Sequence, residues 1–168
     1  PVVAFAEDVA ASGGFWLACA ADEIYADASS ILGSIGVISA GFGFQDFIQR
    51  YGIERRVYAA GDHKGALDPF KPEDPDDIAR LRTAQTAIHD SFKEMVRGRR
   101  AGKITAPEDE LFSGEFWTGT QAKELGLVDD IGDLRSVMRE RFGDKVRFSL
   151  IAPRRSWLRD RFGIGGRS

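Results

Sequence analysis

The fold is decided by the first 21 residues of the chain, PVVAFAEDVAASGGFWLACAA (residues 1–21). Val2–Ala6 is a continuous apolar run, which is typical of a strand buried on both faces. Ser12-Gly13-Gly14 then precedes Phe15–Ala21, whose apolar and small residues favour a buried helix. A buried strand, a glycine-containing turn and a helix in this order are typical of a parallel α/β sheet.

The rest of the chain continues this alternation of strands and helices. We expect further strands at Glu23–Ala26, Gly33–Ser39, Arg55–Ala60, Leu127–Val128 and Val146–Ile151. We expect helices at Phe44–Tyr51, at Asp76–Arg100, after Pro107, from Thr118 to Gly126 and at Leu134–Phe142. The sequence therefore predicts an α/β fold with a largely parallel sheet and flanking helices.

Composition and charge exclude some classes of protein. The 168 residues are 43% hydrophobic, enough for one domain with a core. The net charge of −3 does not favour a nucleic-acid partner, and Cys19, the single cysteine, excludes an internal disulfide. No apolar run approaches the ~20 residues that span a bilayer. Because the sequence opens at Pro1 without an initiator methionine, we expect a fragment or a processed product.

Ser12 is the candidate nucleophile. It precedes two glycines and a predicted helix, so unpaired N–H groups and a positive dipole potential lie beside its hydroxyl. Gly13 has no side chain to keep its N–H from a developing oxyanion. The alternative is an ordinary helix-capping serine beside a glycine-rich packing site.

A serine nucleophile needs a base, and Lys64 is the candidate. It lies in the turn Gly61–Gly65, directly after the expected strand Arg55–Ala60. Desolvation of a lysine at such a place favours its neutral, basic form. The alternative is a solvent-exposed loop lysine. His89 falls within the apolar stripe of the long helix and is expected to be a half-buried structural residue.

At this point the sequence resembles the protease IV/SohB family of signal peptide peptidases, peptidase family S49. The resemblance is carried, in order, by Ala11–Trp16, Ala20–Ala26, Gly33–Val37, Ala60–Lys64 and Ala122–Asp129. It covers positions 1 to about 150.

The resemblance implies a ClpP/crotonase-like fold and a Ser–Lys dyad. Ser12 matches the nucleophile, Lys64 the general base and Gly13 one oxyanion donor. Ser34 matches a serine that orients the lysine, although a turn serine is an equal reading. The implied enzyme is a serine endopeptidase that hydrolyses signal peptides or other apolar unfolded segments without a cofactor or metal. Phe15, Ile35 and Val37 are the candidates to line its substrate groove.

The resemblance also implies how the parent protein is organised. Residues 1–152 correspond to the catalytic domain, and residues 153–168 form a basic amphipathic tail. The N-terminal unit of the fold, which supplies another oxyanion donor and often a membrane anchor, is not in this sequence. The expected partners are a peptide substrate and further copies in a ring, with no nucleic acid. The expected location is the bacterial inner membrane, through the missing segment, with an extracytoplasmic catalytic domain.

Three alternatives remain open. A crotonase-like acyl-CoA enzyme shares the fold class but uses carboxylates and an oxyanion hole, without a serine nucleophile. A non-catalytic assembly module is a reading that suits a truncated chain. A Ser–His–Asp protease is the third, because His63 adjoins Lys64.

Overall fold

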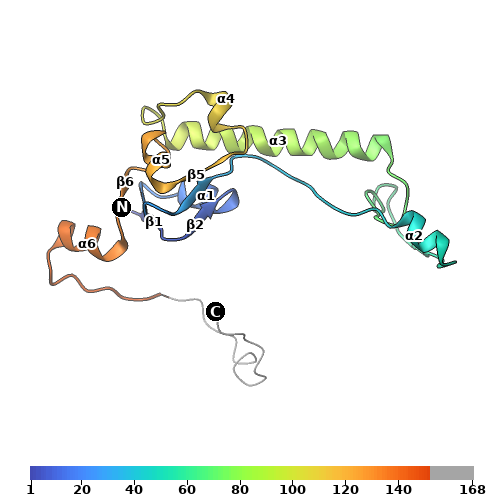
Figure 1. Ribbon diagram of the computed structural model, residues 1–168, viewed down its shortest axis with the longest axis horizontal. Coiled ribbons are helices and arrows are strands. Elements are labelled where there is room, and N and C mark those ends of the chain that lie inside the picture. The colour runs from blue at the N-terminus through green and yellow to red at the C-terminus, as the bar shows by residue number, and fades with distance from the viewer. Residues whose placement is uncertain (152–168) are drawn as a thin grey trace, which may run out of the picture. The chain divides into compact units, whose positions relative to one another are not determined.

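The computed structural model describes residues 1–151. Residues 1–134 form one compact unit, which holds both sheets, and the second unit begins at Arg135 (Figure 1). The described part of the second unit contains most of α6 (Leu134–Phe142), a helix with the predicted bounds. The predicted tail at 153–168 lies outside the described residues, so the domain boundary at 152 stays a prediction.

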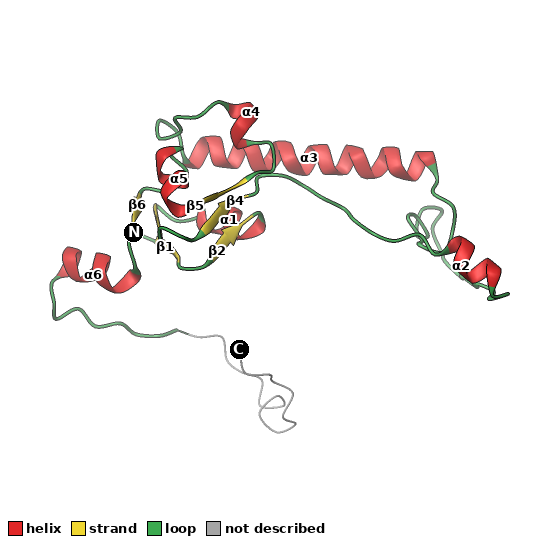
Figure 2. Cartoon of the chain, in the orientation of Figure 1, coloured by secondary structure: helices red, strands yellow, loops and turns green. Residues whose placement is uncertain are grey.

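Two three-stranded sheets form the core of the first unit (Figure 2). In the first sheet, β1 (Val3–Ala6), β3 (Glu23–Ala26) and β6 (Asp130–Ile131) lie in the order β1-β3-β6, all parallel. In the second, β4 (Ile31–Gly33) lies between β2 (Val9–Ala11), to which it is parallel, and β5 (Phe116–Thr118), to which it is antiparallel. The prediction of an α/β fold with mainly parallel pairing is confirmed, but the strands form two sheets.

The first unit also contains helices. They are α1 (Gly13–Ala18), α2 (Gln45–Arg50), α3 (Pro75–Arg99), α4 (Glu108–Leu111) and α5 (Gly119–Glu124). The C-terminal half of α3 packs on the sheets through Phe92 and Val96, which join Phe15, Leu32 and Trp117 in the core. Only this half of the predicted apolar stripe is buried, since Ile88, earlier in the helix, is half exposed.

Residues 37–74, which we call the arm, run from the sheets to the opposite end of α3, where α2 lies (Figure 1). The arm contains α2 and is held together by its own contacts. The Phe44 N–H donates to the Pro69 carbonyl at 2.6 Å, and the Phe44 and Phe70 rings lie 5.7 Å apart. Arg55 pairs with Asp68 at 3.3 Å.

Four predicted strands were wrong or misplaced. Residues 55–60 and 146–151 form no strand, because no neighbouring strand of the described chain pairs with them. The third strand ends at Gly33 rather than continuing to Ser39, since the backbone turns left-handed at Gly33 and Ser34. The strand expected at Leu127–Val128 lies at Asp130–Ile131. Val2–Ala6 is a strand from Val3, but only Ala6 is buried, because β1 is an edge strand.

A buried ion pair joins the C-terminal end of α3 to the segment before β6. Arg100, only 2% exposed, donates from Nε to the Gly126 carbonyl at 3.0 Å and from Nη1 to Asp129 at 2.8 Å. Asp129 also accepts from Lys103 and from the Ile24 N–H. Burial raises the pKa of Asp129, but these hydrogen bonds outweigh it and lower the pKa from 3.8 to about 2.

Candidate active site

Ser12 and Ser34 lie side by side at the ends of two neighbouring strands. The strands β2 and β4 are parallel and pair Ala11 with Gly33, so the two serines that follow occupy the same row. The Ser12 N–H donates to the Gly33 carbonyl at 2.7 Å. Adjacent strands lie about 4.8 Å apart, which brings the two hydroxyl-bearing residues together at the carboxyl edge of the sheet. Chain topology therefore joins two residues 22 positions apart.

Ser12 has a backbone conformation that a non-glycine residue rarely adopts. Its φ is 52° and its ψ is −120°, and its side chain makes no capping hydrogen bond to α1. Helix-capping serines have extended backbones and bond the first turn, so the capping alternative does not describe this residue. Ser12 is exposed, and strained residues of this kind cluster at active sites.

Open space surrounds the turn after Ser12. A Cβ placed on Gly13 or Gly14 would meet nothing within 4 Å. The first N–H groups of a helix have no partner inside it, so those at the start of α1, beside this space, are not paired by the helix. Such groups are the kind of donor that an oxyanion needs, and the assignment of Gly13 to that role stays a prediction.

The turn that carries Ser34 is fixed by several contacts. Ser34 also has a positive φ, 50°, and its N–H donates to the Glu115 carbonyl on β5's side at 2.7 Å. The Gly36 N–H returns to the Ser34 carbonyl at 3.0 Å. Gly33, before it, has a φ of 85°, and a Cβ there would lie 2.5 Å from the Trp117 ring. Backbone geometry thus sets the direction of Ser34.

Helix α3 contacts both serine-bearing segments. Arg99 donates to the carbonyls of Cys19, Ala20 and Ala21 just beyond α1, at 2.6 to 2.8 Å. The Phe92 ring lies 4.6 Å from Trp16 of α1. His89 Nε2 lies 3.0 Å from the Ile35 carbonyl. Sequence reasoning expected His89 to be half-buried, which is confirmed, but it missed these bonds because they join positions more than 50 residues apart.

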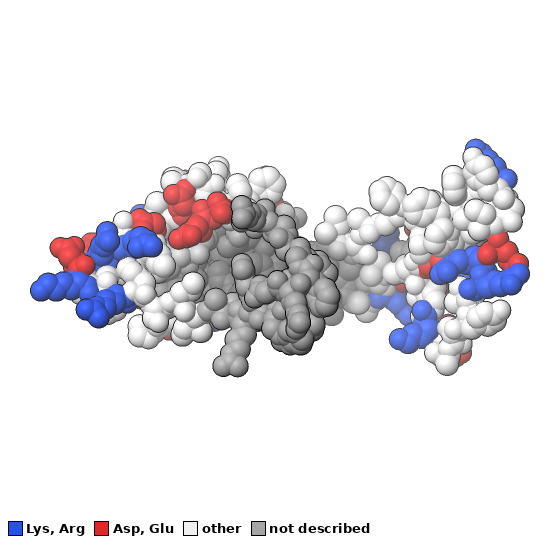
Figure 3. Space-filling model, turned by 90° about the horizontal axis from the view of Figure 1, so that it is seen from below, with Lys and Arg blue, Asp and Glu red and all other residues white. Residues whose placement is uncertain are grey.

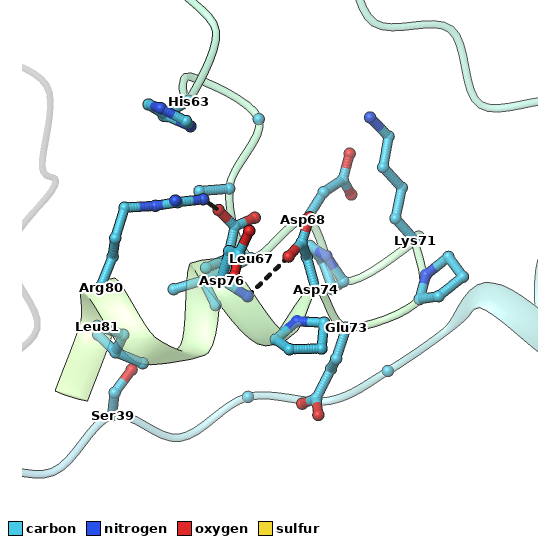
Figure 4. A pocket seen from close by; sticks show the side chains of 18 of the residues that line it. Ser39, His63, Leu67, Asp68, Lys71, Glu73, Asp74, Asp76, Arg80 and Leu81 are labelled. Atoms are coloured by element: carbon cyan, nitrogen blue, oxygen red, sulfur yellow. Dashed lines mark hydrogen bonds and ion pairs between the residues drawn. The ribbon is translucent and has the colours of Figure 1, made fainter.

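Lys64 lies in the arm. It is exposed, in a turn where its N–H donates to the Gly61 carbonyl at 3.1 Å. The same turn borders a cavity of about 1400 Å³, lined by the arm and by residues 74–81 at the start of α3. Figure 4 shows His63, Asp76 and Arg80 around this cavity. The helix α3 extends about 18 Å from Asp77 to His89. Within one chain, the turn with Lys64 therefore lies near the start of α3, whereas the serine-bearing segments contact the helix from His89 onward.

The candidates for a substrate groove separate into two groups. Phe15 and Ile35 are fully buried in the hydrophobic core, so neither side chain can line an open groove in this structure. Their apolar character reflects packing, which corrects the expectation from sequence. Val37 is half-buried and borders a cleft of about 150 Å³ beside His89.

Charge is mixed over the surface. Figure 3 shows acidic and basic side chains intermingled among the described residues on one face. Within residues 1–151, no group of three or more metal-ligating side chains is placed to hold an ion. None of the helices described is both long enough and apolar enough to cross a membrane.

Comparison with known proteins gives a consistent family. The model of peptidase family S49 matches residues 1–145. The putative protease SohB of Buchnera aphidicola subsp. Baizongia pistaciae is 34% identical over 74% of this chain and 35% of its own length. The chloroplastic serine protease SPPA of Arabidopsis thaliana is 33% identical over 80% of this chain and 20% of its own length.

A further relative has a different name. The Na(+)/H(+) antiporter NhaA of Brucella abortus (strain 2308) is 55% identical over 98% of this chain. The match covers 22% of that protein, so the chain spans about a fifth of the length of this relative.

Proposed function

Because the chain belongs to peptidase family S49, we propose that it is the catalytic part of a serine endopeptidase with Ser12 as nucleophile and Lys64 as general base. The observation that carries this proposal is the pair of serines with positive φ on adjacent strand ends, Ser12 and Ser34. Ser12 is exposed, free of a capping bond and next to open space. The α/β architecture with parallel strands is consistent with a ClpP/crotonase-like fold.

The proposed reaction is acyl transfer. Neutral Lys64 takes the Ser12 proton as Oγ attacks the peptide carbonyl, and the Gly13 N–H stabilises the oxyanion. Lys64 then gives that proton to the leaving amine, and an ester joins Ser12 to the substrate. Water, deprotonated by Lys64, cleaves the ester and restores Ser12. Ser34 accepts or donates a hydrogen bond that orients Lys64.

Lys64 reaches Ser12 between copies in this proposal. The turn with Lys64 adjoins the start of α3, whereas the contacts with the serine segments begin at His89. An arm that extends from one copy supplies Lys64 to the Ser12 of its neighbour. This arrangement makes the homo-oligomer, expected as a ring, necessary for activity.

The surface of the arm supports assembly. Several large apolar side chains of the arm are exposed, including Tyr58 at 92% and Phe42 at 81%. Exposed apolar side chains that come together in one patch are typical of an interaction surface. Contact with another copy removes them from water and brings Lys64 with them.

The substrate class is the peptide bond of apolar unfolded segments, such as released signal peptides. Family S49 covers residues 1–145, so we assign peptidase activity, rather than antiport, to the region that matches the Brucella protein. Association with the bacterial inner membrane is part of this proposal and depends on other segments of the parent protein.

A complementation experiment tests the dyad. In the full-length protein, Ser12→Ala and Lys64→Arg are each expected to be inactive, since guanidinium cannot serve as a base. Unfolding and mixing the two variants during refolding should restore activity, because mixed assemblies pair an intact Ser12 with an intact Lys64. If both variants are inactive and the mixture also stays inactive, the dyad forms within one chain. Full activity of either variant alone excludes that residue.

A labelling experiment separates the peptidase from the acyl-CoA alternative. A fluorophosphonate probe should form a covalent adduct at Ser12 and none in Ser12→Ala. A crotonase-like acyl-CoA enzyme would take no label at this position. Peptide mapping by mass spectrometry identifies the labelled residue.

A further inference from the structure

His89 is a titratable side chain that contacts the Ser34 turn and that the proposed mechanism leaves unused. It lies on the part of α3 that packs against the sheets, half-buried, one turn before Phe92. Its Nε2 atom lies 3.0 Å from the carbonyl oxygen of Ile35. A carbonyl only accepts hydrogen bonds, so Nε2 carries the hydrogen and donates it.

This bond adds the third support of the Ser34–Gly36 turn. The Ser34 N–H donates to the Glu115 carbonyl, and the Gly36 N–H donates to the Ser34 carbonyl. The Ile35 side chain is fully buried, while its carbonyl points to α3 and is bonded by His89. The Ser34 N–H, the Ser34 carbonyl and the Ile35 carbonyl therefore each have a partner, and His89 is the one that comes from a side chain.

The position of Ser34 depends on this turn. A residue with φ of 50° is held there by its surroundings rather than by its own preference. A Cβ on Gly36 would lie 3.1 Å from Gly114 Cα, so the turn is also closely packed on its other side. Without the donor from α3, the Ile35 peptide can rotate to find another partner, and Ser34 turns with it.

We propose that His89 is a positioning residue for catalysis, because its bond to the Ile35 carbonyl holds the turn that aims Ser34 at the dyad. This rests on the proposed function, in which Ser34 orients Lys64. The charged neighbours of the ring on α3 are Asp90 and Lys93, which pair with each other at 2.8 Å. The Nε2–H donor is present in the neutral tautomer and in the imidazolium, so the role does not require a change of protonation.

Three variants of the full-length protein test this role. His89→Leu keeps the approximate size and removes the donor, whereas His89→Gln places an amide N–H near the position of Nε2. Ile88→Gln, at a half-exposed neighbour on the same helix, is the matched control. We expect His89→Leu to lower kcat by ten- to a hundredfold with KM within about twofold, because Ser34 orients Lys64 in the proposed mechanism and does not bind the substrate. His89→Gln should recover most of this loss, and Ile88→Gln should match the wild type.

A double-mutant cycle with Ser34→Ala separates positioning from general structural damage. If His89 acts through Ser34, His89→Leu should add less than about twofold to the loss caused by Ser34→Ala. Losses that multiply, or a His89→Leu enzyme with wild-type kcat, overturn the proposal.

Hydrogen exchange gives a readout that does not depend on activity. The Ser34 and Gly36 amides should exchange at least tenfold faster in His89→Leu and at the wild-type rate in His89→Gln. Unchanged exchange in both variants overturns the proposal. Activity that persists in Ser12→Ala is a different result: it overturns the proposed function, and with it any role of His89 in catalysis.

Discussion

At the scale of single residues, the most unusual feature is the strained backbone conformation of Ser12. Its φ of 52° and ψ of −120° cost of order 1–3 kcal/mol in a non-glycine residue. We expect the free energy of unfolding of Ser12→Gly to be about 1 kcal/mol higher than that of Ser12→Ala. Glycine relieves the backbone strain, and this gain should outweigh the larger chain entropy that glycine loses on folding. Urea unfolding of both variants measures the difference. A less stable Ser12→Gly would show that the turn is not strained.

Asp129 makes the stability of the first unit depend on pH. The pKa of Asp129 in the folded protein is about 2, below the ordinary 3.8. The ionised carboxylate therefore contributes fully to the free energy of unfolding above pH 3.8, and this contribution is lost as the pH falls towards 2. Asp129→Asn should be less stable than the wild type at pH 7 by about 3–5 kcal/mol, because Arg100 stays buried without its partner. As the pH falls from 3.8 to 2, the difference in free energy of unfolding between the wild type and Asp129→Asn should become smaller. Unfolding measured across this range checks the sign, and a constant gap would contradict it.

At the scale of elements, α5 begins with a capping box. The Thr118 hydroxyl accepts from the Gln121 N–H, and the Gln121 side chain accepts from the Thr118 N–H at 3.0 Å. Thr118→Ala should lower the free energy of unfolding by about 1 kcal/mol. Thr83→Ala, at an exposed threonine inside α3, is the control and should change it by less than about 0.5 kcal/mol. Equal effects of the two substitutions would mean that the cap adds nothing.

Elements with local signals were the ones that the sequence predicted well. α6 has the expected bounds, and α3 begins and ends one residue earlier than expected, because capping residues and apolar periodicity mark helix ends locally. Strands need a partner, and the segment 55–60 has none in the described chain. Ser12 and Ser34 lie side by side because of the register between β2 and β4. His89 contacts Ile35, 54 positions away in the sequence, because α3 packs against the sheets. Neither leaves a pattern in a single sequence.

At the scale of the whole molecule, assembly is the property on which the proposed activity depends. The last fifteen residues carry five arginines and a single acidic residue, Asp160. Residues 62–77, in the arm and at the start of α3, carry six acidic residues against two lysines. Deleting residues 154–168 should shift the oligomer towards smaller species in sedimentation at low salt, if the tail docks on a neighbour's acidic segment. Raising the salt should move the intact protein in the same direction. An unchanged distribution after deletion rejects docking and leaves the Ser12–Lys64 assignment untouched.

The buried thiol beside α1 has a practical consequence. Cys19 is fully buried, and this burial raises its pKa to about 11, so little thiolate forms at neutral pH. We therefore expect Cys19 to react slowly with alkylating reagents while the chain is folded. A cysteine introduced at Lys64 or elsewhere on the arm can carry a spectroscopic reporter or a cross-linker without prior removal of the native one. If the proposed assembly forms, such a reporter on the arm measures the distance between its copies.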